Sequence, residues 1–198
     1  MDGKPADNAL ARLLAGNERF ASDAPQGNGE YSVRRSQLLR DQHPLAVVLG
    51  CADSRVPPEV IFDQGLGDLF TVRVAGNVVN DAVLGSLEYA VVKLSTPLIF
   101  VLGHEGCGAV AAALNAVRGS KPPPGHIGAL VHAIAPAVKP VRIAANTAPA
   151  VAVRANVAYV VEQLKAAGSI LTRAVREGRL RIVGGFYDLA EGRVSIVA

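Results

Sequence analysis

The sequence predicts an α/β fold in which a mainly parallel central β-sheet is covered by helices. Short apolar runs recur without polar alternation, as in strands that are buried on both faces. Segments with helical spacing separate these runs, and the order strand, crossover helix, strand is typical of parallel sheets. The chain has 198 residues, close to the size of one domain, so we expect a single domain over residues 1–198.

Residues 1–33 are expected to form an arm that consists of a helix and a loop. The segment from Asn8 to Phe20 places three leucines on one helical face, and Asn8 is a possible N-cap. That apolar face needs a partner surface, which predicts that this helix packs on a partner subunit. Residues 21–33 are rich in Gly, Pro, Asn and Ser, and they predict the loop.

The elements that follow are arranged as such a sheet requires. Leu45–Gly50 is a continuous apolar run that ends in glycine, and it is the first of several. We expect strands at Leu45–Gly50, Leu69–Val74 and Pro97–Leu102, and helices at Arg34–Arg40, Asp81–Leu94, Ala109–Val117, Ile127–Val138 and Val151–Ala167. Leu180–Tyr187 and Val194–Val197, joined by Glu191-Gly192-Arg193, predict a closing hairpin at the edge of the sheet.

Composition narrows the class of protein. Half of the residues are hydrophobic and 19% are charged, which suggests a homodimer or higher homo-oligomer with part of the apolar surplus in an interface. The longest apolar stretches stay short of the roughly 20 residues that a membrane helix needs. The N-terminus has no apolar signal segment, so a cytoplasmic location is expected. The net charge of +3 comes from scattered Arg and Lys, without the basic stripe that nucleic-acid binding requires.

The chain contains two cysteines, Cys51 and Cys107. Each lies in a glycine-rich segment beside other ligand-type residues, which favours a metal-binding or catalytic role. A disulfide between them is the alternative, although the expected compartment is reducing. Spacing alone leaves both possibilities open.

Both cysteines follow predicted strands. The motif Cys51-Ala52-Asp53-Ser54-Arg55 comes directly after the first buried strand, and His104-Glu105-Gly106-Cys107-Gly108 follows the strand that ends at Leu102. In parallel α/β sheets, ligands bind beyond the carboxyl ends of the strands. Two neighbouring strand ends could therefore bring together Cys51, His104 and Cys107.

Two thiolates and one imidazole suit Zn²⁺, and three protein ligands leave a fourth position open, as in catalytic sites. The other histidines have no matching spacing and are expected to have ordinary surface or core roles; they are His43, His126 and His132. Zinc that is held by two thiolates is a weaker Lewis acid than zinc held by three imidazoles, so the site needs a nearby acceptor.

The acceptor that the sequence offers is Asp53, two residues after Cys51, and Arg55 could grip its carboxylate bidentately. The alternative interpretation is a surface salt bridge that contributes less than about 1 kcal/mol. Beside a metal site, we favour the catalytic interpretation.

With these two motifs in place, the sequence closely resembles the β-class carbonic anhydrases, and the similarity covers nearly the whole chain. Further matching stretches are Asn17–Phe20, Phe62–Phe70, Arg73–Asn77 and Val183–Asp188. The resemblance implies one zinc per chain on Cys51, His104 and Cys107, and reversible hydration of CO₂ to bicarbonate and a proton. It also implies that Asp53 accepts a hydrogen bond from the zinc hydroxide, while Arg55 holds Asp53 off the metal.

The resemblance further implies a CO₂ pocket lined by Gln42, Phe70 and Tyr89, contributed partly across a dimer interface. A subgroup of the family holds an inhibitory bicarbonate with Trp, Arg and Tyr. Arg73 and Tyr187 match two of these positions, but Val48 stands where the Trp would be, and the chain contains no Trp. Bicarbonate control of that form is therefore not expected.

Two other functions are compatible with the residues. One is hydrolysis of COS or CS₂ on the same site, since these molecules are isosteres of CO₂. The other is a non-catalytic zinc-binding or redox-sensing protein, which explains two cysteines and a histidine but gives no reason for the placement of Asp53 and Arg55.

Overall fold

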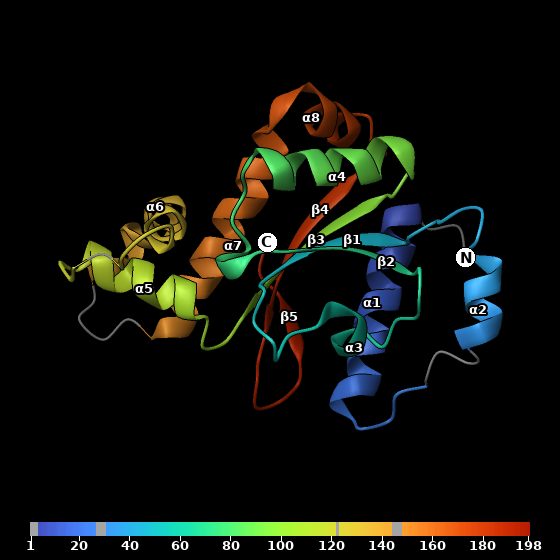
Figure 1. The fold of residues 1–198 in the computed structure, drawn as a ribbon, viewed down its shortest axis with the longest axis horizontal. Helices are drawn as coiled ribbons and strands as arrows, with labels where there is room; N and C mark the ends of the chain where they lie inside the picture. Colours follow the sequence, from blue (N-terminus) through green and yellow to red (C-terminus); the bar gives the residue numbers. More distant parts are fainter. Residues whose placement is uncertain (1–3, 27–30, 122, 144–147) are drawn as a thin grey trace.

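The computed structural model describes residues 4–26, 31–121, 123–143 and 148–198. A five-stranded sheet with the strand order β2-β1-β3-β4-β5 forms its centre (Figure 1). The strands are β1 (Ala46–Gly50), β2 (Leu69–Arg73), β3 (Leu98–His104), β4 (Arg181–Tyr187) and β5 (Val194–Ile196). The first four are parallel, and β5 pairs with β4 in antiparallel orientation at the edge. The predicted mainly parallel sheet with a closing hairpin is confirmed.

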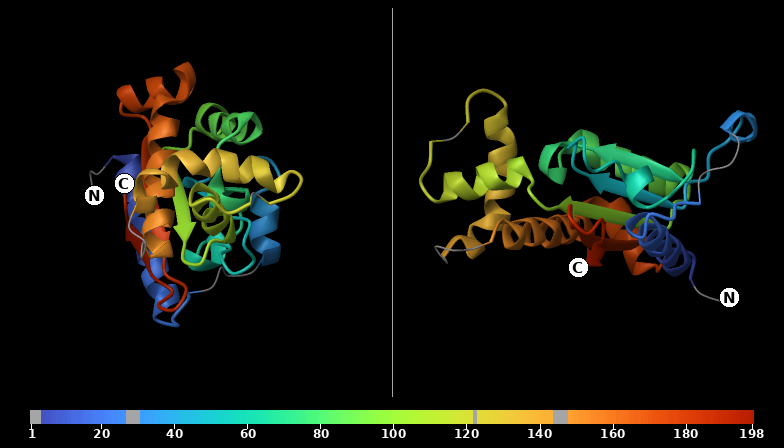
Figure 2. Two further views of the ribbon diagram at one scale, coloured as in Figure 1. Left: turned by 90° about the vertical axis from the view of Figure 1, so that its left-hand side faces the viewer. Right: turned by 90° about the horizontal axis from the view of Figure 1, so that it is seen from below.

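Helices lie on both sides of this sheet (Figures 1 and 2). They are α1 (Pro5–Ala21), α2 (Tyr31–Gln37), α3 (Pro58–Ile61), α4 (Asp81–Lys93), α5 (Gly108–Val117), α6 (Ile127–Val138), α7 (Pro149–Ala166) and α8 (Gly168–Arg176), with 3₁₀ turns η1 (Ala75–Asn77) and η2 (Pro140–Ile143). The sequence analysis did not predict α3 or α8. Among the residues described, no helix is long and apolar enough to cross a membrane.

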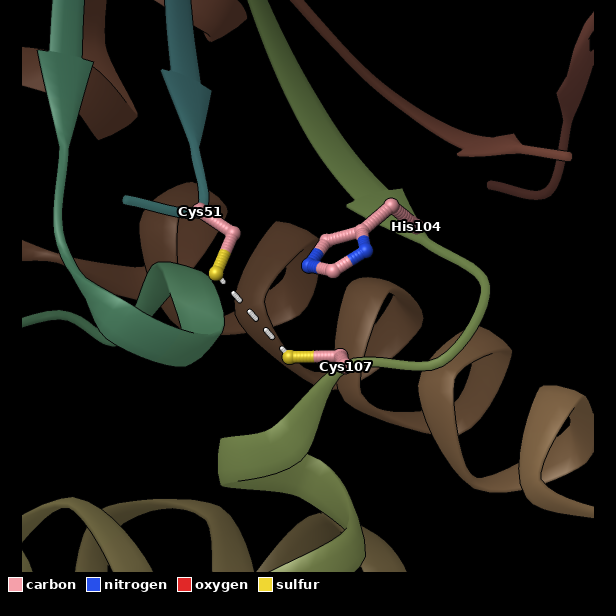
Figure 3. A group of neighbouring side chains, drawn as sticks. All are labelled: Cys51, His104 and Cys107. Carbon is pink, nitrogen blue, oxygen red and sulfur yellow. Dashed lines mark hydrogen bonds between the residues drawn. The ribbon is translucent and has the colours of Figure 1, made fainter. Parts of the chain in front are cut away.

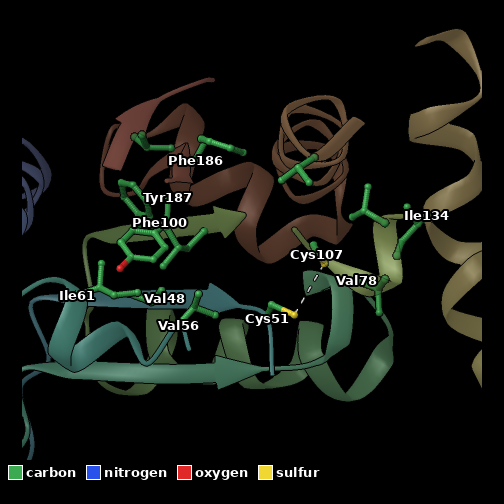
Figure 4. Packing of buried hydrophobic residues seen from close by; sticks show 14 of the residues in the cluster. Val48, Cys51, Val56, Ile61, Val78, Phe100, Cys107, Ile134, Phe186 and Tyr187 are labelled. Atoms are coloured by element: carbon green, nitrogen blue, oxygen red, sulfur yellow. Dashed lines mark hydrogen bonds between the residues drawn. The ribbon is translucent and has the colours of Figure 1, made fainter. Parts of the chain in front are cut away.

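The continuous apolar runs arise because each central strand is buried on both faces. In β1, Ala46 and Val48 point into one hydrophobic cluster, whereas Val47 and Leu49 point into the other. Helices α1, α3, α5 and α6 contribute to the first cluster, helices α4 and α8 contribute to the second, and α7 contributes to both. Both cysteines belong to the first cluster (Figure 4). The core therefore reaches up to the strand ends where the chemistry was predicted.

Helix α1 packs against the core of its own chain. Leu10 and Leu13 are buried in the first cluster, and the amide of Asn17 donates to the carbonyl oxygens of Ile61 (3.1 Å) and Gly192 (2.8 Å). The helix begins at Pro5, so the prediction of Asn8 as its N-cap is wrong; proline starts a helix well because its missing N–H has no intrahelical acceptor there. Packing of α1 on a partner subunit stays a prediction.

The predicted arm and the short helix after it differ from the structure. The helix expected at Arg34–Arg40 is α2, which begins at Tyr31 and ends at Gln37, so the loop predicted for 21–33 ends earlier than expected. Helix α2 has no buried residues, so there was no apolar periodicity to mark its bounds. Residues 27–30 of the predicted loop lie outside the described residues.

Gly16 allows α1 to approach α3 closely. A Cβ atom at this position would lie 1.8 Å from the carbonyl oxygen of Phe62, the residue that follows α3. We predict that Gly16→Ala lowers the free energy of unfolding by at least about 1–3 kcal/mol, because the backbone itself must move. Urea unfolding monitored by circular dichroism measures this change.

Gly85→Ala in α4 is the matched control, since no described residue has an atom within 4 Å of a Cβ built there. Alanine in an open helical position should stabilise the protein by roughly 0.5–1 kcal/mol. The close approach of α1 would be refuted if Gly16→Ala were as stable as the parent chain.

Candidate metal centre

The structure brings Cys51, His104 and Cys107 together at the carboxyl ends of two adjacent strands. Cys51 follows β1, His104 is the last residue of β3, and Cys107 immediately precedes α5. Their side chains point toward one another (Figure 3), and one ligand atom from each lies within 4.8 Å of the others. All three residues are buried. These are the three residues that the sequence analysis expected to meet at neighbouring strand ends.

The two sulfur atoms are 4.0 Å apart and both cysteines are free. A disulfide needs a separation of about 2.05 Å. The structure therefore holds two thiols beside an imidazole, and the two cysteines do not form a disulfide.

The imidazole of His104 is oriented as a metal ligand would be. Its Nδ1 lies 2.8 Å from the carbonyl oxygen of Glu105, and since a carbonyl only accepts, Nδ1 carries the proton. The other ring nitrogen, Nε2, is buried and has no hydrogen-bond partner among the described residues. A buried lone pair without a partner is costly, whereas a metal ion would use it.

The electrostatics of the two thiols also favour a bound cation. Hydrogen bonding from Cys107 lowers the pKa of Cys51 well below its usual range, helped by His104 and the Gly76 amide. The pKa of Cys107 is raised by Cys51 and by burial, which together outweigh the helix amides of Val110 and Ala109. The predicted thiolate at Cys107 thus needs a cation beside it. Zinc fits this set of two sulfurs and one nitrogen.

Asp53 and Arg55 form a locked pair next to the cluster. The guanidinium donates through Nε to Oδ1 (2.9 Å) and through Nη2 to Oδ2 (2.8 Å), and the Arg55 amide adds a bond of 3.0 Å to Oδ1. These bonds hold the pKa of Asp53 well below its usual range, so the carboxylate is charged at neutral pH. A Cβ at Gly106 would lie 3.8 Å from Nη2 of Arg55, which places the pair against the loop that carries His104 and Cys107.

Arg73, at the end of β2, holds the loop after β1 in place. It donates to the carbonyl oxygen of Cys51 (2.9 Å) and to that of Asp53 (2.5 Å). Sequence analysis matched Arg73 only to a bicarbonate site and missed this contact. The sequence showed only that an arginine stands at the carboxyl end of a predicted strand. It did not show which strand lies beside that one, so the contact with the loop after β1 could not be predicted.

The residues predicted to line the CO₂ pocket lie elsewhere in the chain. Gln42 precedes β1, whereas Cys51 follows it, so a five-residue strand of roughly 17 Å separates them. Phe70 pairs with Val47 near the start of β1, and its ring centroid lies 6.2 Å from that of Tyr89 on α4. Gln42 and half-exposed Tyr89 are accessible at the surface. Within one chain, the structure does not bring these residues to the metal centre.

Comparison of the sequence with known protein families gives a match that is consistent with a metal centre at these residues. The family model for carbonic anhydrase matches residues 46–194. The chain belongs to the carbonic anhydrase family, and its mainly parallel sheet with the cysteine and histidine cluster places it in the β class.

Curated relatives carry the same designation. Carbonic anhydrase 2 of Mycobacterium tuberculosis is 45% identical over 188 residues, which cover 95% of this chain and 91% of that protein. The carbonic anhydrase of Mycolicibacterium smegmatis is 42% identical and covers 97% of this chain and 95% of its own length.

Solved structures of β-carbonic anhydrases share the fold. The Coccomyxa enzyme, solved in complex with acetazolamide, superposes with a TM-score of 0.73 at 28% identity and covers 95% of this chain and 86% of that one. CafA of Aspergillus fumigatus superposes with a TM-score of 0.72 at 29% identity, covering 94% and 89%. A structure of the tetrameric β-carbonic anhydrases of Sordaria macrospora, at 24% identity and a TM-score of 0.74, supports the fold alone.

Proposed function

We propose that this chain catalyses the reversible hydration of CO₂ to bicarbonate and a proton, with one zinc ion held by Cys51, His104 and Cys107. The observation that carries the proposal is the convergence of these three buried ligand atoms, with the unpartnered Nε2 of His104 among them. Membership of the carbonic anhydrase family supports the choice of reaction. The bound metal would supply a Lewis acid that lowers the pKa of a coordinated water.

Three residues of the chain place charge and fix the backbone beside the metal centre. Asp53 is an acceptor that stays ionised, so it can receive a hydrogen bond from the nucleophile and keep it oriented. Arg55 occupies both carboxylate oxygens, which keeps Asp53 from swinging onto the metal. Arg73 fixes the backbone on both sides of Ala52, so the distance between Cys51 and Asp53 is set before substrate arrives.

Gln42, Phe70 and Tyr89 are proposed to line the CO₂ pocket of a partner subunit. One amide and two aromatic rings suit a small apolar substrate that becomes an anion. Their distance from the metal centre of their own chain, and the exposure of Tyr89 and neighbouring Val92, support a role across a homodimer interface. The tetrameric neighbour from Sordaria macrospora is an assembly of this fold.

Hydrolysis of COS or CS₂ would use the same metal centre. The names of the relatives at 45% and 42% identity favour CO₂. Turnover of CO₂ by stopped flow and of COS by sulfide release, measured on one preparation, separates the two reactions.

The metal prediction concerns Cys107→Ser. The parent chain should contain about one zinc by elemental analysis, because one polypeptide supplies all three ligands. The variant should lose the zinc and the activity together. His132→Ala, which removes an exposed histidine of α6, should retain both. A Cys107→Ser protein with full zinc and the parent rate would refute the ligand assignment.

The catalytic prediction concerns Arg55→Ala. The variant should keep its zinc, while kcat falls on the order of 100-fold, the loss typical of a misplaced group in an active site. Arg179→Ala, which breaks the exposed ion pair with Glu177, should have the parent rate. Equal rates for the two variants would reduce Asp53–Arg55 to a surface ion pair.

A further prediction concerns how the hydration rate changes with pH. In the parent chain Asp53 is already ionised at neutral pH, since its pKa is depressed, so its titration cannot limit activity there. The rate of hydration should instead rise on the alkaline side of neutrality, because a metal held by two thiolates would lower the pKa of a bound water less than one held by three imidazoles. Initial rates between about pH 6 and 9 measure this, and a flat profile would contradict it.

The last prediction from the proposed function concerns the oligomeric state. Light scattering should give a homodimer or a larger assembly, and Val92→Asp on α4, beside Tyr89, should shift it toward single chains with lower activity. Val151→Asp replaces a similarly exposed valine on α7 and is the control. A fully active single-chain species of the parent protein would overturn the role proposed for the partner subunit.

A further inference from the structure

Asn156 is a polar residue in the middle of an otherwise apolar buried helix face. It is 1% exposed, and its buried neighbours along α7 are Val153, Val157 and Val160. Burial of an amide costs free energy unless its polar atoms are bonded. The amide of Asn156 therefore needs a hydrogen-bond partner in the core.

The partner of Asn156 lies in the turn beside the metal centre. Nδ2 of Asn156 donates to the carbonyl oxygen of Gly76 over 3.0 Å, a bond that joins residues 80 positions apart. The backbone N–H of Gly76 in turn donates to Sγ of Cys51 over 3.3 Å. One residue of η1 therefore connects an amide on α7 with a sulfur of the candidate metal centre.

The conformation of Gly76 makes this connection possible. Its φ of 72° lies in the left-handed region that favours glycine, and a Cβ there would lie 2.6 Å from Cδ1 of Ile134 and 3.0 Å from Cβ of Ala109. Upstream, the Val74 amide ties the segment to Gly50 of β1 over 3.1 Å. The bond from Asn156 holds the other side of Gly76, so both sides of the turn are anchored.

We propose that Asn156 is a positioning residue that holds Gly76 so that its N–H is directed at the Cys51 sulfur, and that it thereby sets the affinity of the chain for zinc. This inference rests on the proposed zinc site. Hydrogen bonds to a metal-bound thiolate stabilise its charge and fix its direction, and loss of such outer contacts typically lowers metal affinity 10–100-fold. Asn156 acts through one intervening residue, so the lower end of this range is expected.

The test measures zinc affinity by competition with a chromogenic chelator for the parent chain and Asn156→Leu, which keeps the branched shape of the side chain but cannot donate a hydrogen bond. We expect about a tenfold weaker affinity. In the cobalt-substituted protein, the sulfur-to-cobalt charge-transfer band should also shift, because the Cys51 sulfur loses a directed donor. Neither readout requires CO₂ turnover.

Val161→Ala on the same helix is the control, because it removes buried apolar volume without contact to Gly76. It should lower the urea midpoint but leave zinc affinity and the cobalt spectrum unchanged. If Asn156→Leu fails to fold, Asn156→Ser is used instead, since a hydroxyl can bond to its own helix but is too short to reach Gly76.

The outcomes separate the inference from the function on which it rests. A parent chain that binds no zinc would refute the proposed function. If the parent chain binds zinc and the Asn156 variants bind it equally tightly with an unaltered cobalt spectrum, the proposed role of Asn156 alone is wrong.

Discussion

The parallel pairing of β1 with β3 is the constraint on which the rest of the structure depends. It aligns Gly50 with Leu102, so Cys51, which follows β1, and His104, which ends β3, lie at the same end of the strands. Both strands are buried on both faces, and each of their residues before His104 is apolar or glycine. Chemistry is therefore confined to the strand ends, where Cys51 and His104 meet.

Burial of the ligands creates an electrostatic problem that the chain alone does not solve. Two thiols 4.0 Å apart cannot both ionise easily, and within the described part of the chain Nε2 of His104 has no hydrogen-bond partner. A divalent cation resolves both conditions, because it compensates the charge of two thiolates and takes the free lone pair. Packing of the hydrophobic cluster thus keeps the three ligand atoms close together. These atoms are themselves stabilised only when a metal is bound.

The edge strand β2 contributes support to this centre. Its last residue, Arg73, binds the backbone of the loop after β1, and the turn that follows carries Gly76 to the Cys51 sulfur. Asn156 joins the turn to α7, which packs across the sheet. An ion pair such as Asp53–Arg55 adds little to stability at the exposure seen here.

By itself, the sequence determined the parallel sheet, the order of most helices and the residues that could bind a metal, because strand burial and ligand spacing are local patterns. Helices α3 and α8 escaped prediction, one because it has only four residues and the other because it directly follows α7. Only the tertiary structure decided that Arg73 and Gly76 contact Cys51 and that Asn156 contacts Gly76, since these contacts join residues 22 to 80 positions apart. Only the fold, likewise, shows that Gln42 and Phe70 lie toward the opposite end of the strands from Cys51, because each strand carries its residues in one direction across the sheet.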